Sequence, residues 1–378
     1  MIHRLRRAAA DVFSRPALYW TIAVLFGLNR VIFTVLAPRR YDAEGMWEGA
    51  HAYLTNPSHM YDAAADYLAR VHIIAPPGGL DAFVSPPPVA LLAFPVALLP
   101  RSIGVQVWTA IDAGALVVAL VLLYRVLASR DRVARPIFWL VAAYFPPLFA
   151  DVYPAAMIVG PRPAHRIRYA LVLFGVLVLV TAATFIPLGV GGTLFYYQHV
   201  LLPSLASHNP DCAYDSVRTL FMRTIGGEPF AVPSSTGYEI VTSPIHFSGL
   251  ALVLSYLSAV LFAAGAAWAA WRSDWNPAYG MSLGFALGAL IPNEVWPYQW
   301  LPLLPVGLIL LVRAVERRRT VTLVLLGLCL LGFWRQPCEL FFPNLWTIAG
   351  IGIFVLALWE NRLFRSEPVG GSANAAQR

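Results

Sequence analysis

Apolar runs recur along the whole sequence, separated by short segments that carry most of the arginines. Several of these runs approach the length of about 20 residues that a helix needs to cross the hydrocarbon core of a bilayer. Hydrophobic residues make up 58% of the chain and charged residues only 12%, whereas a soluble domain carries about 25% charged residues. The pattern excludes an ordinary globular protein and predicts an all-α polytopic membrane protein.

The apolar runs predict ten candidate spans, interrupted by two long polar segments. The spans cover residues 17–37, 87–100, 103–127, 137–159, 169–190, 248–271, 281–292, 298–312, 321–334 and 345–359. The polar segments are residues 38–85 and 191–247. We therefore expect a single transmembrane domain over residues 1–378, in which a helical bundle crosses the bilayer and the two polar segments are outer loops.

Arginines in the short loops predict the orientation of the chain, because positively charged loops stay in the cytoplasm. Arginines before the first span put the N-terminus inside, and no small-residue cleavage pattern follows, so we expect this span to be retained. Alternation puts the arginines at residues 162–168, 272 and 313–319 inside as well. The loop at residues 125–135 falls outside, against the rule. Either one of the two preceding runs is not a crossing, or the span count is wrong there.

Other features of the composition exclude several classes of protein. The net charge of +7 comes from loop arginines without a basic stripe of interleaved aromatics, so nucleic acid is not an expected partner. The cysteines have no metal-type spacing; Cys212 and Cys338 are both predicted outside and form a pair in one interpretation, while separate packing roles are favoured. No nucleotide-binding or zinc-protease motif is present, so we expect no cofactor and no metal.

The first outer segment contains a predicted helix with two different faces. Residues 42–54 put apolar side chains at helical spacing and acidic side chains on another side, which is typical of a helix that lies in the membrane interface. The apolar set is Met46, Trp47, Ala50, Tyr53 and Leu54, and the acidic set is Asp42, Glu44 and Glu48. Asn56-Pro57-Ser58 is expected to end this helix, and residues 61–71 are expected to form a second one.

Asp42 is the candidate catalytic residue of this segment. It lies a few residues beyond the first span, at the boundary between lipid and water. A carboxylate there can take the proton of a hydroxyl nucleophile while one substrate stays in the bilayer. In the alternative interpretation Asp42 caps the helix that follows it, and one residue can do both. Glu44, on the same helix, is a candidate substrate-binding residue.

Basic residues of the second outer segment are candidates for binding a phosphate group. His208, Arg218 and Arg223 lie in this segment, and the fork of a guanidinium group matches the geometry of a phosphate. In the alternative interpretation the two arginines pair with acidic residues of a folded loop. The acidic residues available for this are Asp211, Asp215 and Glu228.

Two short outer segments complete the set of candidates. Glu294, Trp296 and Tyr298 join two spans at the outer boundary, where aromatic rings are expected as anchors and a carboxylate usually has a partner or a function. Sugar rings stack on indole, so these three residues are candidate substrate contacts. Arg335, in the other short segment, is a further candidate for the phosphate. Asp112 lies inside a predicted span, where a hydrogen-bonded interior role is favoured over a functional one.

The first third of the chain resembles the GT-C glycosyltransferases of family 87, which are polytopic enzymes that use a lipid-phosphate sugar. In that family a span is followed by an aspartate, an aromatic–small–small helix, a Tyr-Asp pair, a proline turn and an apolar run ending in Leu-Pro. The matching residues are Asp42, Trp47, Ala50, Leu54, Tyr61-Asp62, Pro86-Pro87-Pro88 and Leu99-Pro100. The resemblance covers residues 20–125 and is looser over residues 193–310.

The resemblance implies a GT-C-like bundle with Asp42 as general base. The implied reaction is an inverting transfer of a sugar from a polyprenyl-phosphate donor to a hydroxyl of a glycolipid or lipoglycan, at the outer face of the plasma membrane. Actinobacterial relatives are α-mannosyltransferases of phosphatidylinositol mannosides and lipomannan, or arabinofuranosyltransferases of the cell wall. Mannose is therefore the first expectation and arabinose the second. The sequence leaves the oligomeric state open.

Two departures from the family pattern keep other functions open. Residues 146–154 run straight across a place where relatives carry a Gly-Gln-x-Asn stretch and two further spans. Trp296-Pro297-Tyr298-Gln299 stands where relatives often have Trp-x-His-His. One alternative is therefore a shortened, inactive relative that only binds glycolipid. Another is a transporter of lipid-linked sugars, which the apolar span centres and the lack of a visible inverted repeat disfavour.

Overall fold

The computed structural model describes residues 16–18, 20–25, 28, 41–70, 83, 87–127, 134–144, 175, 178–179, 182, 188–203, 216–234, 237–273, 277–291, 300, 303–333 and 344–361. Within these ranges the chain is mostly helical, and the predicted helical architecture is confirmed at that level. Two helices, Arg101–Arg125 and Ser248–Arg272, are long and apolar enough to cross a membrane. The ten spans and the GT-C-like arrangement stay predictions.

The first part of the fold is a set of helices from the first outer segment and the runs that follow it. They are α3 (Tyr41–Thr55), the 3₁₀ turn η1 (Pro57–His59), α4 (Asp62–Arg70), α5 (Pro87–Ala97) and α6 (Arg101–Leu127). The helices expected at residues 42–54 and 61–71 are confirmed as α3 and α4. Pro57 begins η1 just beyond the end of α3, and a proline there cannot extend the preceding helix because it has no backbone N–H to donate.

The remaining elements follow in chain order. They are α7 (Ala134–Tyr144), the π-helical turn η4 (Tyr197–Leu201), α10 (Val217–Thr224), β1 (Pro229–Ser234), β2 (Gly237–Thr242), α11 (Ser248–Arg272), α12 (Pro277–Leu290), α13 (Leu303–Glu316), α14 (Thr320–Gly332) and α15 (Leu345–Trp359). The strands β1 and β2 form an antiparallel hairpin in which Pro229 lies opposite Thr242 and Ser234 lies opposite Gly237. This hairpin was not expected from the sequence.

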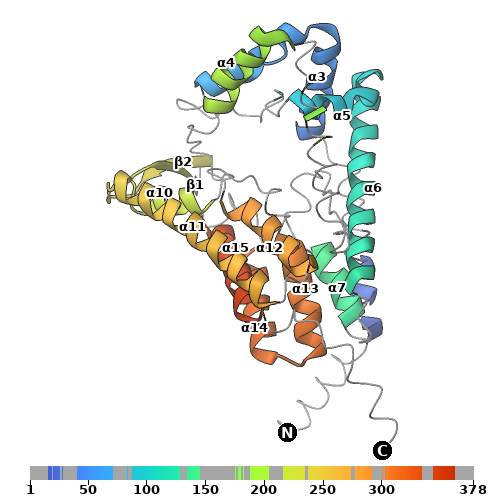
Figure 1. The fold of residues 1–378 in the computed structure, drawn as a ribbon, viewed down its shortest axis with the longest axis vertical. Helices are drawn as coiled ribbons and strands as arrows, with labels where there is room; N and C mark the ends of the chain where they lie inside the picture. Colours follow the sequence, from blue (N-terminus) through green and yellow to red (C-terminus); the bar gives the residue numbers. More distant parts are fainter. Residues whose placement is uncertain are drawn as a thin grey trace, which may run out of the picture.

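A first hydrophobic core joins α3, α4, α5, the start of α6 and residues 188–200 (Figure 1). Its buried side chains are Ala43, Met46, Trp47, Ala50, Met60, Tyr61, Ala64, Phe83, Ala90, Ala93, Val96, Ala97, Val105, Trp108, Leu188, Tyr196 and Val200. The apolar face of α3, assigned from the sequence to the membrane interface, packs against α5 and α6. Leu54, which the sequence put on that face, is exposed.

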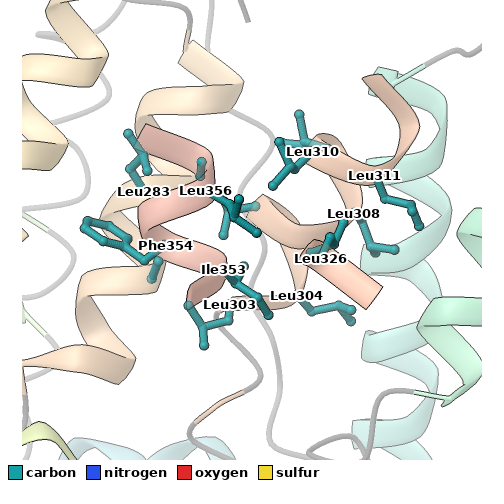
Figure 2. Packing of buried hydrophobic residues seen from close by; sticks show 14 of the residues in the cluster. Leu283, Leu303, Leu304, Leu308, Leu310, Leu311, Leu326, Ile353, Phe354 and Leu356 are labelled. Carbon is teal, nitrogen blue, oxygen red and sulfur yellow. The ribbon is translucent and has the colours of Figure 1, made fainter. Parts of the chain in front are cut away.

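A second core lies among the end of α6, α7 and the helices α10 to α15. Figure 2 shows aliphatic and aromatic side chains of four helices meeting there, with Leu283 on α12, Leu308 on α13, Leu326 on α14 and Phe354 on α15. Its largest fully buried residues are Trp300, Trp346, Tyr279, Phe138, Phe333 and Phe354. Most of α13 is buried on all sides, which is expected for a helix at the centre of a bundle.

The helix α5 is shorter than a helix that crosses a bilayer, whereas residues 87–100 were expected to form a crossing. It has 11 residues, with Pro95 inside it, so at 1.5 Å per residue it reaches about 16 Å, against about 30 Å for a hydrocarbon core. It lies across the upper end of α6 and beneath α3 (Figure 1). Ala90, Ala93, Val96 and Ala97 of α5 are buried by protein, whereas Phe94 is exposed. The long helix that leaves this region is α6.

One end of the second core collects several helix termini. The Tyr279 hydroxyl donates to the Ala357 carbonyl at 2.7 Å, and the Thr322 hydroxyl donates to the Glu360 carboxylate. The starts of α12 and α14 and the end of α15 therefore lie together, and Figure 1 shows the lower end of α6 on this side, opposite α3 and α4. The described arginines in these connections and termini are Arg125, Arg135, Arg272, Arg313, Arg317, Arg318 and Arg319.

Candidate functional site

The helix α3 carries the candidate catalytic residue, Asp42, and the indole of Trp47 holds this helix against its neighbours. Ala43, Met46, Trp47 and Ala50 fall on one face at helical spacing, and all four are buried. The Trp47 Nε1–H donates to the carbonyl oxygen of Leu99 at 3.1 Å, in the turn between α5 and α6. Residue 104 is a glycine, and a side chain there would overlap the indole ring. The tryptophan therefore connects α3 to the α5–α6 corner.

An ion-pair cluster, which we call the Arg101 bridge, adds a second connection. It consists of Arg101 at the start of α6 and of Glu44 and Glu48 on α3. The Arg101 Nη2 lies 3.2 Å from Glu44 Oε2, and its Nε lies 3.1 Å from Glu48 Oε1. Glu44, a predicted substrate contact, is thus engaged by protein. Sequence reasoning missed Arg101 because its partner Glu44 is 57 residues away in the chain.

Asp42 lies in the first turn of α3, which begins at Tyr41. Asp42 is the second described residue of this helix. Its side chain lies outside the described set. The position of the Asp42 backbone depends on how α3 packs. Glu44 and Trp47, two and five residues further along α3, are both bound to the α5–α6 corner.

The residue pair Tyr61-Asp62 splits into a buried and an exposed half. Tyr61 is 2% exposed, and its ring lies 4.6 Å from the ring of Tyr196 and 5.9 Å from that of Phe83, between centroids. Burial raises the pKa of the Tyr61 hydroxyl far above its ordinary value and raises the pKa of Tyr196 to about 12. Asp62 is exposed and lies 2.7 Å from Nδ1 of His59. Tyr61 is therefore a neutral packing residue.

His51, on α3, is a neighbour of Trp47 that the sequence analysis did not identify. The imidazole of His51 stacks on the Trp47 indole, with the ring centroids 4.7 Å apart and the planes 10° apart. His51 follows Trp47 by one helical turn, and this spacing is the signal that identifies such a pair. Its side chain is partly exposed, so the stack presents a polar ring edge beside the first core.

The two candidate arginines of the second outer segment lie on α10 with Glu228 near them. Ser216 begins α10 through a capping box with Thr219: the Thr219 N–H donates to Ser216 Oγ at 3.0 Å, and the Ser216 N–H donates to Thr219 Oγ1 at 2.6 Å. Arg223 is 3% exposed, and its guanidinium carbon lies 5.9 Å from the ring centroid of Phe230.

The pKa of Glu228 is affected by its burial and by both arginines. Burial raises the pKa of the Glu228 carboxyl above its ordinary value, while the positive charges of Arg218 and Arg223 act to lower it. The structure therefore places Glu228 near both arginines, as the alternative interpretation of a folded loop expects for this acidic residue. The helix α10 packs on α11 and lies apart from α3 in Figure 1, so the structure does not bring these arginines to the helix of Asp42.

The raised pKa of Glu228 gives a pH dependence with a definite sign. The folded state holds the proton more tightly than the unfolded state, whose value is near 4.5, so stability from this group is present below that pH. It is lost as the pH rises through the raised pKa, because the carboxyl must then ionise while partly buried. Compared with Glu228→Gln, the wild type should lose stability as the pH rises from below 4.5 to above it. Thermal unfolding of both proteins in detergent across this range measures the difference. A wild-type advantage that grows with pH would show that the attraction of the arginines exceeds the effect of burial.

The other predicted site residues lie outside the described residues. They are His208, Glu294, Trp296, Tyr298 and Arg335. The described residues also leave out the predicted partners Asp211 and Asp215, the cysteines Cys212 and Cys338, and the side chain of Asp112. Among the residues that the structure does describe, no group of three or more metal-ligating side chains is found. Comparison of the chain with protein-family models, with curated proteins and with solved structures gives no match.

Proposed function

We propose that this chain is a membrane glycosyltransferase. It would move a sugar, with mannose as the first candidate and arabinose as the second, from a polyprenyl-phosphate donor to a hydroxyl of a glycolipid or lipoglycan. The acceptor and the donor lipid both reside in the bilayer, and the chain has the helices and apolar surface for that environment: Val117, Val118, Val253, Val260 and Leu261 are exposed on the two long helices.

The observation that supports this proposal is the meeting of the residues that carry the family resemblance. Trp47 and Leu99 are 52 residues apart in the chain but share a hydrogen bond. Ala50 and Tyr61 lie in the same first core as Trp47. Leu54 and Asp62, which also belong to the resemblance, are exposed. Several residues of the resemblance thus lie together, as residues that build one site would. The same core holds α3, which carries Asp42 in its first turn.

The proposed chemistry needs one proton acceptor and one leaving group. The Asp42 carboxylate takes the proton of the acceptor hydroxyl as its oxygen attacks the anomeric carbon of the donor sugar. The bond from that carbon to the phosphate oxygen breaks on the opposite face, so polyprenyl phosphate leaves and the anomeric configuration inverts. A cationic side chain near the leaving phosphate would stabilise its charge. The candidates for this contact are His208 and Arg335, since Arg218 and Arg223 lie on α10, apart from α3.

We assign the arginine-rich end of the bundle to the cytoplasm and the α3–α4 end to the outer face. If α5 is not a crossing, the chain passes through the membrane once, along α6, between residue 101 and the loop at residues 125–135. That loop then lies inside, in agreement with the positive-inside rule. For residues 191–247 to stay outside and Arg272 and Arg313 inside, the runs at residues 137–159 and 169–190 must make one crossing between them. The short length of α5 and its position across α6 support this assignment.

A transfer assay tests the proposed function. The purified, detergent-solubilised protein is given radiolabelled polyprenyl-phosphate mannose and a membrane glycolipid extract, and the expected result is label in a new glycolipid. No label with either a mannose or an arabinose donor would overturn the proposal in favour of a shortened relative that only binds glycolipid. Flux of labelled lipid across vesicles without a new glycosidic bond would instead identify a transporter.

A further inference from the structure

The turn between α13 and α14 has a backbone that its residues do not favour. The Arg319 N–H donates to the carbonyl of Ala314 at 2.9 Å, and the Arg318 N–H donates to the carbonyl of Val315 at 3.1 Å. These two bonds form a Schellman motif, in which the residue after the helix end adopts the left-handed conformation. That residue is Arg318, with φ of 52°. Glycine is the usual residue there, because any Cβ is disfavoured at positive φ.

Helix capping does not explain an arginine at this position. A positive charge near a helix C-terminus is favoured by the helix dipole, but Arg313 and Arg317, in or beside the last turn of α13, supply it without a left-handed backbone. Arginine at position 318 therefore works against the conformation of the turn. A residue of this kind at an exposed position is the starting point for a hypothesis about its side chain, and the hypothesis must be carried by the surroundings of the turn.

The electrostatics of the turn are strongly positive. Two acidic groups at this end of the bundle have partners of their own, since Glu316 pairs with Arg313 at 3.0 Å and Glu360 accepts a hydrogen bond from Thr322. Arg318 and Arg319 are exposed, and neither forms an ion pair with any residue that the structure describes. The turn thus presents adjacent guanidinium groups to the surroundings, at the lower end of the bundle in Figure 1.

An exposed apolar stripe begins directly after this turn. Val321 is 74% exposed, and Val324, Leu328 and Leu331 follow on the outer side of α14. The opposite face of α14, with Thr322 and Leu326, is buried in the bundle. Positive side chains at one end of an apolar stripe match the layered chemistry of a phospholipid, with a charged headgroup above acyl chains.

We propose that the turn Arg317–Arg319 binds the phosphate of an anionic phospholipid whose acyl chains lie along the exposed face of α14. Guanidinium groups donate paired N–H bonds that fit a phosphate, and adjacent arginines favour a headgroup with net negative charge. The inference rests on the turn and on α14, and it is independent of the catalytic proposal.

The test separates the charge of residue 318 from its backbone. The full chain is purified in detergent and stripped of lipid, and its unfolding midpoint is measured with added phosphatidylglycerol, phosphatidylcholine or inorganic phosphate. Phosphatidylglycerol should raise the wild-type midpoint more than the other two additions do. Arg318→Gly should lose about half of that rise, because Arg319 remains nearby, while its lipid-free midpoint stays equal to or above that of the wild type. Arg318→Lys should keep most of the rise.

A second readout counts the bound lipid directly. Native mass spectrometry should find phosphatidylglycerol retained on the wild type and lost from the double variant Arg318→Gly, Arg319→Gln. An equal midpoint rise in wild type and Arg318→Gly would overturn the proposal. So would equal rises with phosphatidylglycerol and phosphatidylcholine, which would indicate general solvation of the apolar stripe. An equal rise with inorganic phosphate would assign the turn to a free phosphate ion instead of a lipid.

Discussion

Asp42→Asn should abolish sugar transfer while the protein stays folded and in the membrane. The amide has nearly the shape of the carboxylate but cannot accept the proton of the acceptor hydroxyl, so kcat/KM should fall by about 10²–10⁴. The docking of α3 should persist, because it depends on the buried face of the helix, on the Trp47 hydrogen bond to Leu99 and on the Arg101 bridge. Initial rates with labelled polyprenyl-phosphate sugar, normalised to protein in the membrane fraction, measure the loss.

Asp66→Asn is the matched control for this change. Asp66 is an exposed carboxylate of α4 in the same outer segment, so its neutralisation changes the local charge by the same amount without touching α3. Its rate should stay close to that of the wild type. Transfer by Asp42→Asn at the wild-type rate would exclude Asp42 as the base. Equal losses in both variants would point to the charge of the segment as the cause.

Trp47→Ala should release α3 from the α5–α6 corner, at a cost of about 3–5 kcal/mol in the stability of the first core. The change removes a buried indole and also leaves the Leu99 carbonyl without its N–H donor. Amide hydrogen exchange followed by mass spectrometry is the measurement. Peptides from α3 should exchange faster by a factor of about 10² or more, whereas peptides from α15 in the second core should be unchanged.

Two further variants separate the contributions to the docking of α3. Trp47→Phe keeps an aromatic ring but removes the N–H, so it should cost about 1–3 kcal/mol. Arg101→Ala removes ion pairs whose side chains are half-exposed, so it should cost less than about 1 kcal/mol. Faster exchange in α15 as well as in α3 would contradict local release and would indicate that Trp47 supports the whole protein. A larger effect of Arg101→Ala than of Trp47→Ala would contradict the ranking of the two connections.

Helices were the part of the structure that the sequence predicted well. The apolar run at residues 345–359 has the same bounds as α15, and the amphipathic pattern at residues 42–54 gave α3 to within a residue. Hydrophobic periodicity carries this information because it repeats over several turns. The same signal cannot say what buries an apolar face. It therefore put Leu54 on the covered side of α3, although Leu54 is exposed, and it could not predict that one face of α5 packs against α3 and α6.

The sequence offered candidates for the site only where local chemistry gave a signal. Asp42 and Glu44 were selected because acidic residues beside an apolar run are uncommon, and their roles in a site stay predictions. Arg101 was missed because ion pairing between residues so far apart in the chain leaves no local pattern, and the hairpin was missed because Pro229 and Pro233 weaken the strand signal of β1. Whether α10 approaches α3 is likewise a property of the tertiary fold, and no spacing of Arg218 or Arg223 in the sequence encodes it.

The helix α6 belongs to both hydrophobic cores, with Val105 and Trp108 in the first and Leu120 in the second. Loss of the first core would leave α6 held by the second core, so α3, α4 and α5 can open while the helices of the second core stay packed. Unfolding of this chain is therefore expected to be divided into two cooperative units with separate free energies. If the proposed function is correct, substrates that enter from the bilayer would meet the unit that contains α3, and opening of α3 would depend on the first core alone.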